Sequence, residues 1–109
     1  MVLSTITLNP AIDKTYYVRN LLVDGVNRVE RIKVNMGGKG VNVAATAAKS
    51  GISCIAGGFL SGYNGQMIGK YLKDAGVNTD FVYTEGDTRI NIKIMDMENQ
   101  TYTDINESG

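Results

Sequence analysis

The sequence predicts an α/β fold, in which a parallel βαβ core carries a small separate β-sheet. β-rich segments alternate with apolar helical stripes in the order strand, helix, strand, helix, strand, which indicates parallel strands joined by helices. Glycines stand between these segments or at their ends. Two further regions alternate apolar and polar residues, and such half-polar strands fit poorly in a parallel sheet covered on both faces.

Three segments are the predicted strands of the core. Residues 3–8 are β-rich and stop at Pro10, which cannot donate to a ladder, so we expect a buried strand there. Residues 53–59 are compact and apolar, and residues 81–83 form a short β-rich run. These segments predict a small parallel sheet.

Two helices connect the predicted core strands. Residues 41–48 carry apolar side chains at i, i+3, i+4 and i+7, which predicts a helix that ends at Gly51. The same stripe recurs over residues 68–75, where we expect Asn64 as the N-cap and Gly76 as the end.

The remaining strands form the predicted separate sheet. Residues 15–18 are β-rich, residues 31–36 and 89–94 alternate strictly, and residues 101–105 follow a turn, so the last two segments form a hairpin. One face of these strands is apolar and lacks covering helices, which predicts that a partner surface buries it. The opposite face bears Arg89, Asn91 and Lys93.

Length and composition describe one domain, because the chain has 109 residues, of which 43% are hydrophobic. We assign residues 1–13 and 37–87 to the core, and strands at about 14–36 and 88–106 to the separate sheet. Three core strands alone would leave a long unprotected edge. We therefore expect residues 1–109 to be the N-terminal part of a larger domain.

Charge and composition exclude several classes of function. The formal net charge is zero and the cations are scattered, so we expect neither nucleic acid nor a membrane as partner. The chain has no His and a single Cys, which excludes Ser/His and Cys/His catalytic pairs and a Cys-based zinc site, and we predict no metal site. No secretory signal precedes the first strand, so we expect a cytoplasmic protein.

A Gly-Gly-Lys-Gly segment at 37–40 joins a predicted strand to a predicted helix. Such a junction exposes backbone N–H groups, and glycine lets a ligand approach the main chain. The segment is not a Walker A loop, because Lys33 stands where glycine is needed, and Val43 excludes a dinucleotide fingerprint. A tight turn and a ligand-binding loop both remain open for this motif by itself.

Asp13 follows the first predicted strand at its carboxyl end, which is where open α/β sheets bind ligands. A carboxylate in this place is also typical of a turn or helix cap. Both interpretations stand for the residue taken alone.

Four segments together resemble the ribokinase-like (PfkB) sugar kinases, in their phosphosugar branch. They are Thr-Leu-Asn-Pro-Ala-Ile-Asp at 7–13, Gly-Gly-Lys-Gly-Val-Asn-Val-Ala at 37–44, Gly-Gly-Phe-Leu at 57–60 and Thr-Arg-Ile-Asn-Ile-Lys at 88–93. The combination spans nearly the whole chain. The resemblance implies a ribokinase-like core with the separate sheet as a lid over the sugar, and a homodimer formed through that lid.

The resemblance also implies a reaction, the transfer of the ATP γ-phosphoryl group to the 6-hydroxyl of fructose 1-phosphate. Within the family, the last segment is most similar to the kinases of fructose 1-phosphate, and tagatose 6-phosphate or another sugar is the alternative substrate. A sugar-phosphate-binding or dimerisation module without catalysis is the alternative from another class.

Several residues match the family's substrate motifs. The resemblance implies that Asp13 accepts hydrogen bonds from sugar hydroxyls and that Asn42 binds another hydroxyl. Gly37 and Gly38 would let the sugar lie against the backbone.

Two cationic side chains complete the substrate site that the resemblance implies. Lys39 and Arg89 would hold the phosphate that the substrate already carries, and the arginine offers a planar fork suited to it.

The family's second half, with its Gly-Ala-Gly-Asp segment, catalytic aspartate and sites for ATP and Mg²⁺, has no match here. We therefore expect no catalytic residue among these 109, a catalytic base that lies beyond Gly109, and no turnover by this chain alone.

Overall fold

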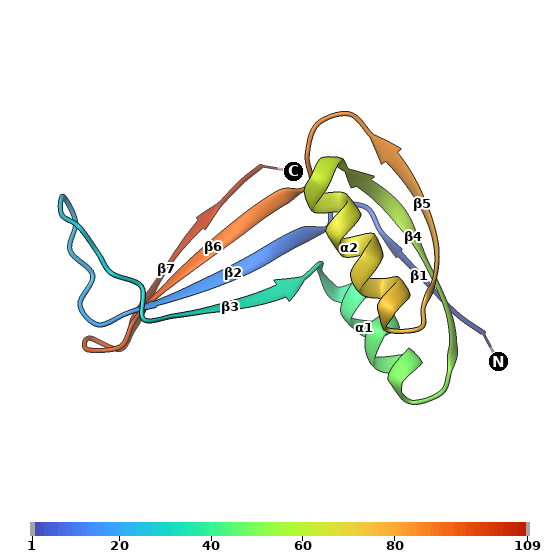
Figure 1. The fold of residues 1–109 in the computed structure, drawn as a ribbon, viewed down its shortest axis with the longest axis horizontal. Coiled ribbons are helices and arrows are strands. Elements are labelled where there is room, and N and C mark those ends of the chain that lie inside the picture. Colours follow the sequence, from blue (N-terminus) through green and yellow to red (C-terminus); the bar gives the residue numbers. More distant parts are fainter. Residues whose placement is uncertain (1, 109) are drawn as a thin grey trace.

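The computed structural model describes residues 2–108, which form two sheets and two helices (Figure 1). One part, the core unit, contains a parallel sheet of β1 (Val2–Thr7), β4 (Ser53–Ser61) and β5 (Asn78–Thr84) in that order. Helices α1 (Lys39–Lys49) and α2 (Gly62–Asp74) cover one face of this sheet. The prediction of parallel strands joined by helices is confirmed.

Two terminal residues, Met1 and Gly109, lie outside the described residues. The structure does not test the expectation that the catalytic base follows Gly109, which therefore stays a prediction. Within residues 2–108, neither helix is long and apolar enough to cross a membrane.

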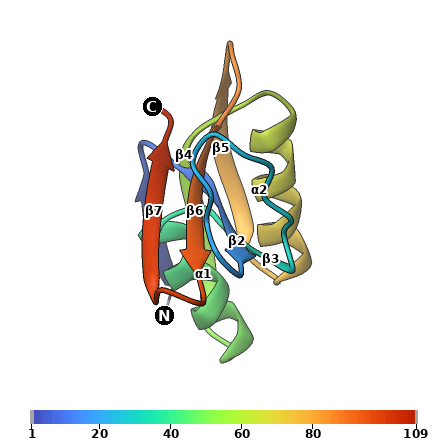
Figure 2. The ribbon, with the colours of Figure 1, turned by 90° about the vertical axis from the view of Figure 1, so that its left-hand side faces the viewer.

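The second sheet, the lid sheet, extends away from the core unit (Figure 1). Its strands are β2 (Ala11–Val18), β3 (Arg31–Met36), β6 (Arg89–Asp96) and β7 (Thr101–Asn106). Their spatial order is β3-β2-β6-β7, and Figure 2 shows them side by side. β2 and β6 are parallel at the centre, and β3 and β7 are antiparallel at the edges. The predicted separate sheet is confirmed.

A hydrophobic core fills the space between the helices and the parallel sheet. Its largest fully buried side chains in the core unit are Val41, Leu60, Ile68 and Leu72. Burial of each such side chain stabilises the fold by about 1.5–3 kcal/mol. Ile12 of β2 belongs to the same cluster, so the inner end of the lid sheet rests on the core unit.

Strand β2 is longer than the sequence predicted. It begins at Ala11 rather than at residue 15, because its first residues pair with β3 on one side and β6 on the other. Asp13 therefore lies on a lid strand and not in a turn after β1. This pairing is long-range, and the local sequence around Pro10 indicates only a break.

The predicted N-cap of α2 was wrong. The helix begins at Gly62, and Asn64 lies inside its first turn. Asp87, from the loop after β5, accepts a hydrogen bond from the Asn64 N–H at 3.0 Å. The Asn64 side chain in turn donates to the carbonyl oxygen of Thr88 at 2.9 Å. A carboxylate that is distant in sequence thus takes the role expected of a local cap.

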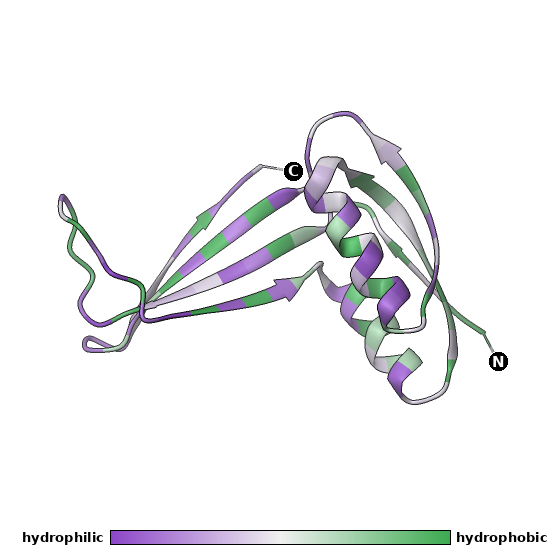
Figure 3. Ribbon diagram, in the orientation of Figure 1, coloured by the Kyte–Doolittle hydropathy of each residue, from purple (hydrophilic) through white to green (hydrophobic). Residues whose placement is uncertain are grey.

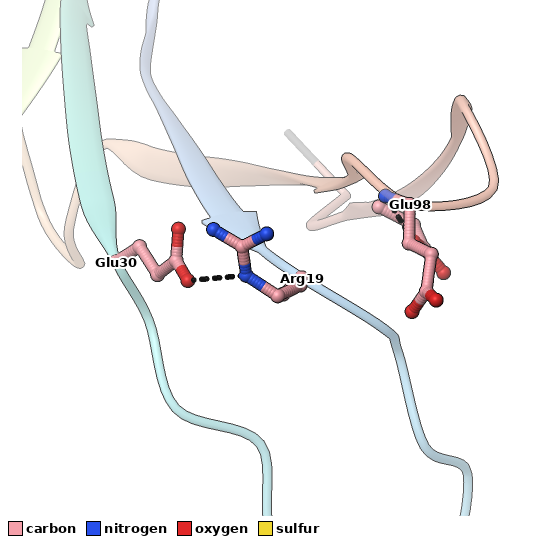
Figure 4. A network of polar contacts seen from close by, with 4 residues as sticks. Arg19, Glu30 and Glu98 are labelled. Atoms are coloured by element: carbon pink, nitrogen blue, oxygen red, sulfur yellow. Dashed lines mark hydrogen bonds and ion pairs between the residues drawn. The ribbon is translucent and has the colours of Figure 1, made fainter.

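Polar contacts hold the outer end of the lid sheet together (Figure 4). The guanidinium of Arg19 forms an ion pair with Glu30 across the ends of β2 and β3, with an N–O distance of 3.1 Å. The backbone N–H of Glu98 donates to the carbonyl oxygen of Arg19 at 3.2 Å. These contacts connect the long loop after β2 to the turn between β6 and β7.

Candidate functional site

The lid sheet has one polar face and one largely apolar face. Alternate residues along each strand point to opposite faces, and hydrophobic and hydrophilic colours alternate along β6 in Figure 3. Asp13 pairs with Asn35 of β3 and Asn91 of β6, and Asn91 pairs with Asn106 of β7. Residues paired in this way share a face. Three carboxamides and one carboxylate thus form a row across the sheet.

A cavity of about 330 Å³ lies on this polar face. Residues from all four lid strands line it: Asp13, Lys14, Thr15, Asn35, Asn91, Ile92, Lys93, Asp104 and Asn106. Carboxylate groups accept hydrogen bonds from hydroxyls, and carboxamide groups both accept from them and donate to them. The chemistry of this cavity, called the lid pocket below, therefore suits a small polyhydroxylated ligand.

Asp13 and Asn91 form the central contact of the lid pocket. The Asn91 amide nitrogen Nδ2 donates to Oδ1 of Asp13 at 3.2 Å. The Asn91 carbonyl oxygen Oδ1 is buried, and it has no hydrogen-bond partner among residues 2–108. Buried polar atoms are nearly always paired in folded proteins. An unpaired acceptor beside a carboxylate indicates a place for a donor from a ligand.

The glycine segment lies next to the inner end of the lid pocket. The N–H of Gly37 donates to the carbonyl oxygen of Ala11 at 2.6 Å, which ties the end of β3 to the start of β2. Gly37 and Gly38 have φ values of 84° and 101°, which favour glycine. A Cβ atom on Gly37 would lie 2.7 Å from the Val41 side chain. The chain can therefore turn from strand into helix here only with a residue that lacks a side chain.

Lys39 and Asn42 belong to the first turn of α1, directly after these glycines. Both residues are exposed. The backbone N–H of Asn42 donates to the carbonyl oxygen of Gly38 at 3.0 Å, and Gly38 itself has no side chain to cap the helix. The start of α1 thus presents backbone N–H groups near the inner end of the lid sheet.

Arg89 begins β6 and pairs with Ala11, two residues before Asp13. Its guanidinium makes long contacts of 3.4 Å to the carbonyl oxygens of Asn9 and Glu107. The Nε atom is buried and has no partner within the described residues. Charged donors are costly to leave unpaired, so this guanidinium is suited to an anion.

The structure does not bring all the predicted residues into one cavity. Arg89 lines a neighbouring crevice of about 290 Å³ at the carboxyl ends of the parallel strands, with Asn9, Phe59 and Asp87 among its other residues. Asp13 lines the lid pocket, and the two hollows are neighbours along β6, where Arg89 lines the crevice and Asn91, two residues further on, lines the lid pocket.

Gly37, Gly38 and Lys39 line neither of these two hollows, and Asn42 lines a separate hollow on α1 together with Val43, Thr46 and Ala47. The structure therefore places only Asp13 and Arg89 of the predicted residues in the lid pocket and the crevice.

Five polar lining residues were not singled out from the sequence: Lys14, Thr15, Asn35, Asp104 and Asn106. Their alternation with apolar neighbours predicts a polar face, but it does not say which strands are adjacent. The carboxylates that line the lid pocket are Asp13 and Asp104, and residues 2–108 contain no group of three or more metal-binding side chains.

Comparisons with known proteins agree with this geometry. The sequence pattern of the pfkB family carbohydrate kinases matches residues 6–109. A solved structure of a proposed 1-phosphofructokinase from Thermotoga maritima is 37% identical, with a TM-score of 0.84. A proposed phosphofructokinase from Staphylococcus aureus is 31% identical, with a TM-score of 0.87. Phosphofructokinase-2 from Escherichia coli, solved with substrates and products, is 25% identical, with a TM-score of 0.85.

These structures are longer than the present chain. Each comparison covers 100% of the 109 residues, but only 36%, 34% and 36% of the three relatives in the same order. The chain thus spans about a third of their length. The core unit and the lid sheet together match the N-terminal part of such kinases.

Proposed function

Because this chain belongs to the pfkB family of carbohydrate kinases, we propose that it is the phosphosugar-binding part of a 1-phosphofructokinase. The whole enzyme would use ATP to convert fructose 1-phosphate into fructose 1,6-bisphosphate in the cytoplasm. The observation that carries the proposal is the pair of adjacent hollows, one lined by hydroxyl-binding groups around Asp13 and one containing the unpaired guanidinium nitrogen of Arg89. In this proposal the hydroxyls of a phosphosugar bind in the hollow around Asp13, and its phosphate binds in the hollow that contains Arg89.

The lid pocket binds the sugar in this proposal. Asp13 uses one oxygen for Asn91, so its second oxygen is available to accept from a sugar hydroxyl. Gly37 and Gly38 allow the sugar to lie against the backbone, and Asn42 in the first turn of α1 donates to or accepts from another hydroxyl. The arrangement orients the acceptor hydroxyl, and orientation contributes most of the rate in phosphoryl transfer.

Arg89 and Lys39 bind the phosphate that the sugar already carries. A guanidinium makes two parallel hydrogen bonds to phosphate oxygens, and these bonds are stronger than the 3.4 Å contacts that Arg89 makes within the chain. Lys39 is exposed and flexible, and it adds a second positive charge. Recognition of this phosphate distinguishes a phosphosugar from the free sugar.

ATP and Mg²⁺ would be bound by a part of the family fold that this chain does not span. When bound, they supply the γ-phosphoryl group and neutralise its charge. In the whole enzyme the acceptor hydroxyl would form a bond to the γ-phosphorus as the bond from that phosphorus to the ADP oxygen breaks, and its proton would pass to a catalytic base in the part of the family fold that this chain does not span. This chain binds and orients the acceptor, and the lid sheet shields it from water.

The apolar face of the lid sheet supports association with a second copy of the chain. Ile32, Val34 and Ile105 are 54%, 45% and 55% exposed, on the face opposite the lid pocket. The expectation that helices leave this whole face uncovered was wrong at its inner end, where Met36 and Ile90 contact the core of the same chain. The outer part is the proposed homodimer surface.

Isothermal titration calorimetry on the 109-residue chain tests the function. We expect fructose 1-phosphate to bind, fructose to bind much more weakly, and ATP not to bind. Titration with tagatose 6-phosphate distinguishes the alternative substrate of the same family. A coupled ADP-release assay should find no turnover by this chain alone. Phosphosugar binding without any kinase activity in a chain that spans the whole family fold would favour a non-catalytic binding module. If none of the phosphosugars binds, the proposed function is wrong.

A further inference from the structure

The Asn91 side chain is oriented by its contact with Asp13. Its Nδ2 group donates to the Asp13 carboxylate at 3.2 Å. Turning the amide over would bring the Asn91 carbonyl oxygen against that carboxylate, so two acceptors would face each other. The observed orientation is therefore set by charge, and the carbonyl oxygen Oδ1 is directed away from this contact.

That oxygen is buried, and nothing within residues 2–108 donates to it. Leaving an acceptor buried and unpaired is unfavourable, whereas pairing it with a ligand hydroxyl recovers the lost interaction. Asn91 also lines the lid pocket together with Asp13. The residue that carries the unpaired oxygen therefore lines a cavity that is suited to a polyhydroxylated ligand.

We propose that Asn91 is a positioning and specificity-determining residue, which holds Asp13 in place and accepts a hydrogen bond from a second hydroxyl of the sugar. The inference rests on the proposed function and adds a residue to it. One free oxygen of Asp13 and the carbonyl oxygen of Asn91 form two neighbouring acceptors. Two hydroxyls on adjacent carbons of a sugar match this pair, and a sugar that lacks either hydroxyl leaves one acceptor unpaired.

The chain contains a matched control for this role. Asn106 lies in the same row on the same face and pairs with Asn91 from the next strand. It also lines the lid pocket, but it is exposed, and β7 is not adjacent to β2. Asn106 shares residue type, row and pocket with Asn91 but does not contact Asp13.

The test compares Asn91→Ala with Asn106→Ala in titrations of the 109-residue chain. The ligands are fructose 1-phosphate and its deoxy analogues, each lacking one ring hydroxyl. We expect Asn91→Ala to weaken binding of the complete sugar phosphate by about tenfold or more. For one deoxy analogue the same substitution should change binding by less than about twofold, because the hydroxyl partner is already missing. Asn106→Ala removes another carboxamide of the same pocket, and we expect it to leave the affinity ratio between the complete sugar phosphate and that deoxy analogue as it is in the unmodified chain.

Three results are decisive. If Asn91→Ala weakens all analogues by the same factor, or if Asn106→Ala reproduces its pattern, Asn91 has only a structural role and the inference is wrong. If the unmodified chain binds no sugar phosphate, the proposed function fails and this inference fails with it.

Asn91→Asp tests the orientation of the side chain, because it keeps the shape but places a second negative charge against Asp13. We expect this variant to bind the sugar phosphate at least as weakly as Asn91→Ala does. Affinity equal to that of the unmodified chain in Asn91→Asp would overturn the positioning role.

Discussion

The carboxylate of Asp96 accepts a hydrogen bond from the backbone N–H of Leu21 at 3.0 Å, although the two residues lie 75 positions apart in the chain. Asp96 is only 4% exposed, and it also accepts from the backbone N–H groups of Glu98 and Asn99. A single carboxylate therefore joins the loop after β2 to the turn between β6 and β7 at the outer end of the lid sheet.

Stability should depend on the ionisation of Asp96. The side-chain amide of Asn99, followed by the backbone N–H groups of Asn99 and Leu21, holds the pKa of Asp96 below its usual value. A lowered pKa in the folded state means that these bonds stabilise the fold above the usual carboxyl pKa, and that this stabilisation is lost as the pH falls through the lowered pKa. We expect Asp96→Asn to lower the melting temperature at neutral pH and to flatten its decline toward acid pH. Thermal unfolding followed by circular dichroism measures both.

The control is Asp74→Asn, which removes an exposed ion pair with Lys70 and should have little effect on the melting temperature. An unchanged pH profile in Asp96→Asn would contradict the prediction.

Arg89→Ala should weaken binding of fructose 1-phosphate by about 2 kcal/mol or more, which is about 30-fold, because a charge-assisted fork to phosphate is lost. Binding of unphosphorylated fructose should hardly change. Calorimetric titration of both sugars gives the comparison. Arg19→Ala removes an exposed arginine at the far end of the lid sheet and should leave both affinities unchanged. An equal loss for both sugars would mean that Arg89 is a structural residue.

Gly37→Ala should be more destabilising than Gly51→Ala. Both glycines have a φ of 84°, so each substitution strains the backbone by about 1–2 kcal/mol. Only Gly37 also has a neighbour in the way, because a Cβ atom there would lie 2.7 Å from Val41, whereas nothing lies within 4 Å at Gly51. The additional loss in the free energy of unfolding should be about 1–3 kcal/mol, measured by urea denaturation. Equal losses would show that the turn before α1 can shift to accept a side chain.

Val34→Asp should abolish the proposed homodimer, whereas Lys33→Asp should leave it intact. The two residues are neighbours on β3 and point to opposite faces of the lid sheet. Val34 is 45% exposed on the apolar face, and a charge there cannot be buried against a second copy. Sedimentation velocity over a range of concentrations measures the association. A monomeric unmodified chain, or an intact dimer of the Val34 variant, would rule out this face as the interface.

Local patterns in the sequence were sufficient to predict the elements and the two faces of the lid sheet. The spacing of apolar residues over 41–48 predicts α1, and Ile90, Ile92 and Ile94 alternate with polar residues as β6 requires. Such patterns are readable because a helix and a strand repeat their side-chain directions every few residues. Asn64 and the start of β2 were misjudged, since their partners, Asp87 and β6, lie far along the chain.

The sequence by itself determined that the chain has an α/β core with a half-polar separate sheet and that Asp13, Arg89 and the glycines at 37–40 are candidates for a ligand site. Only the tertiary structure decided that β2 and β6 lie parallel in register, which places Asp13 against Asn91 and leaves the Asn91 oxygen buried and unpaired. The physical reason is that strand pairing is set by the packing of Ile12 and its neighbours in a shared core, between residues that are remote in sequence. No local period specifies which strand becomes the neighbour of another.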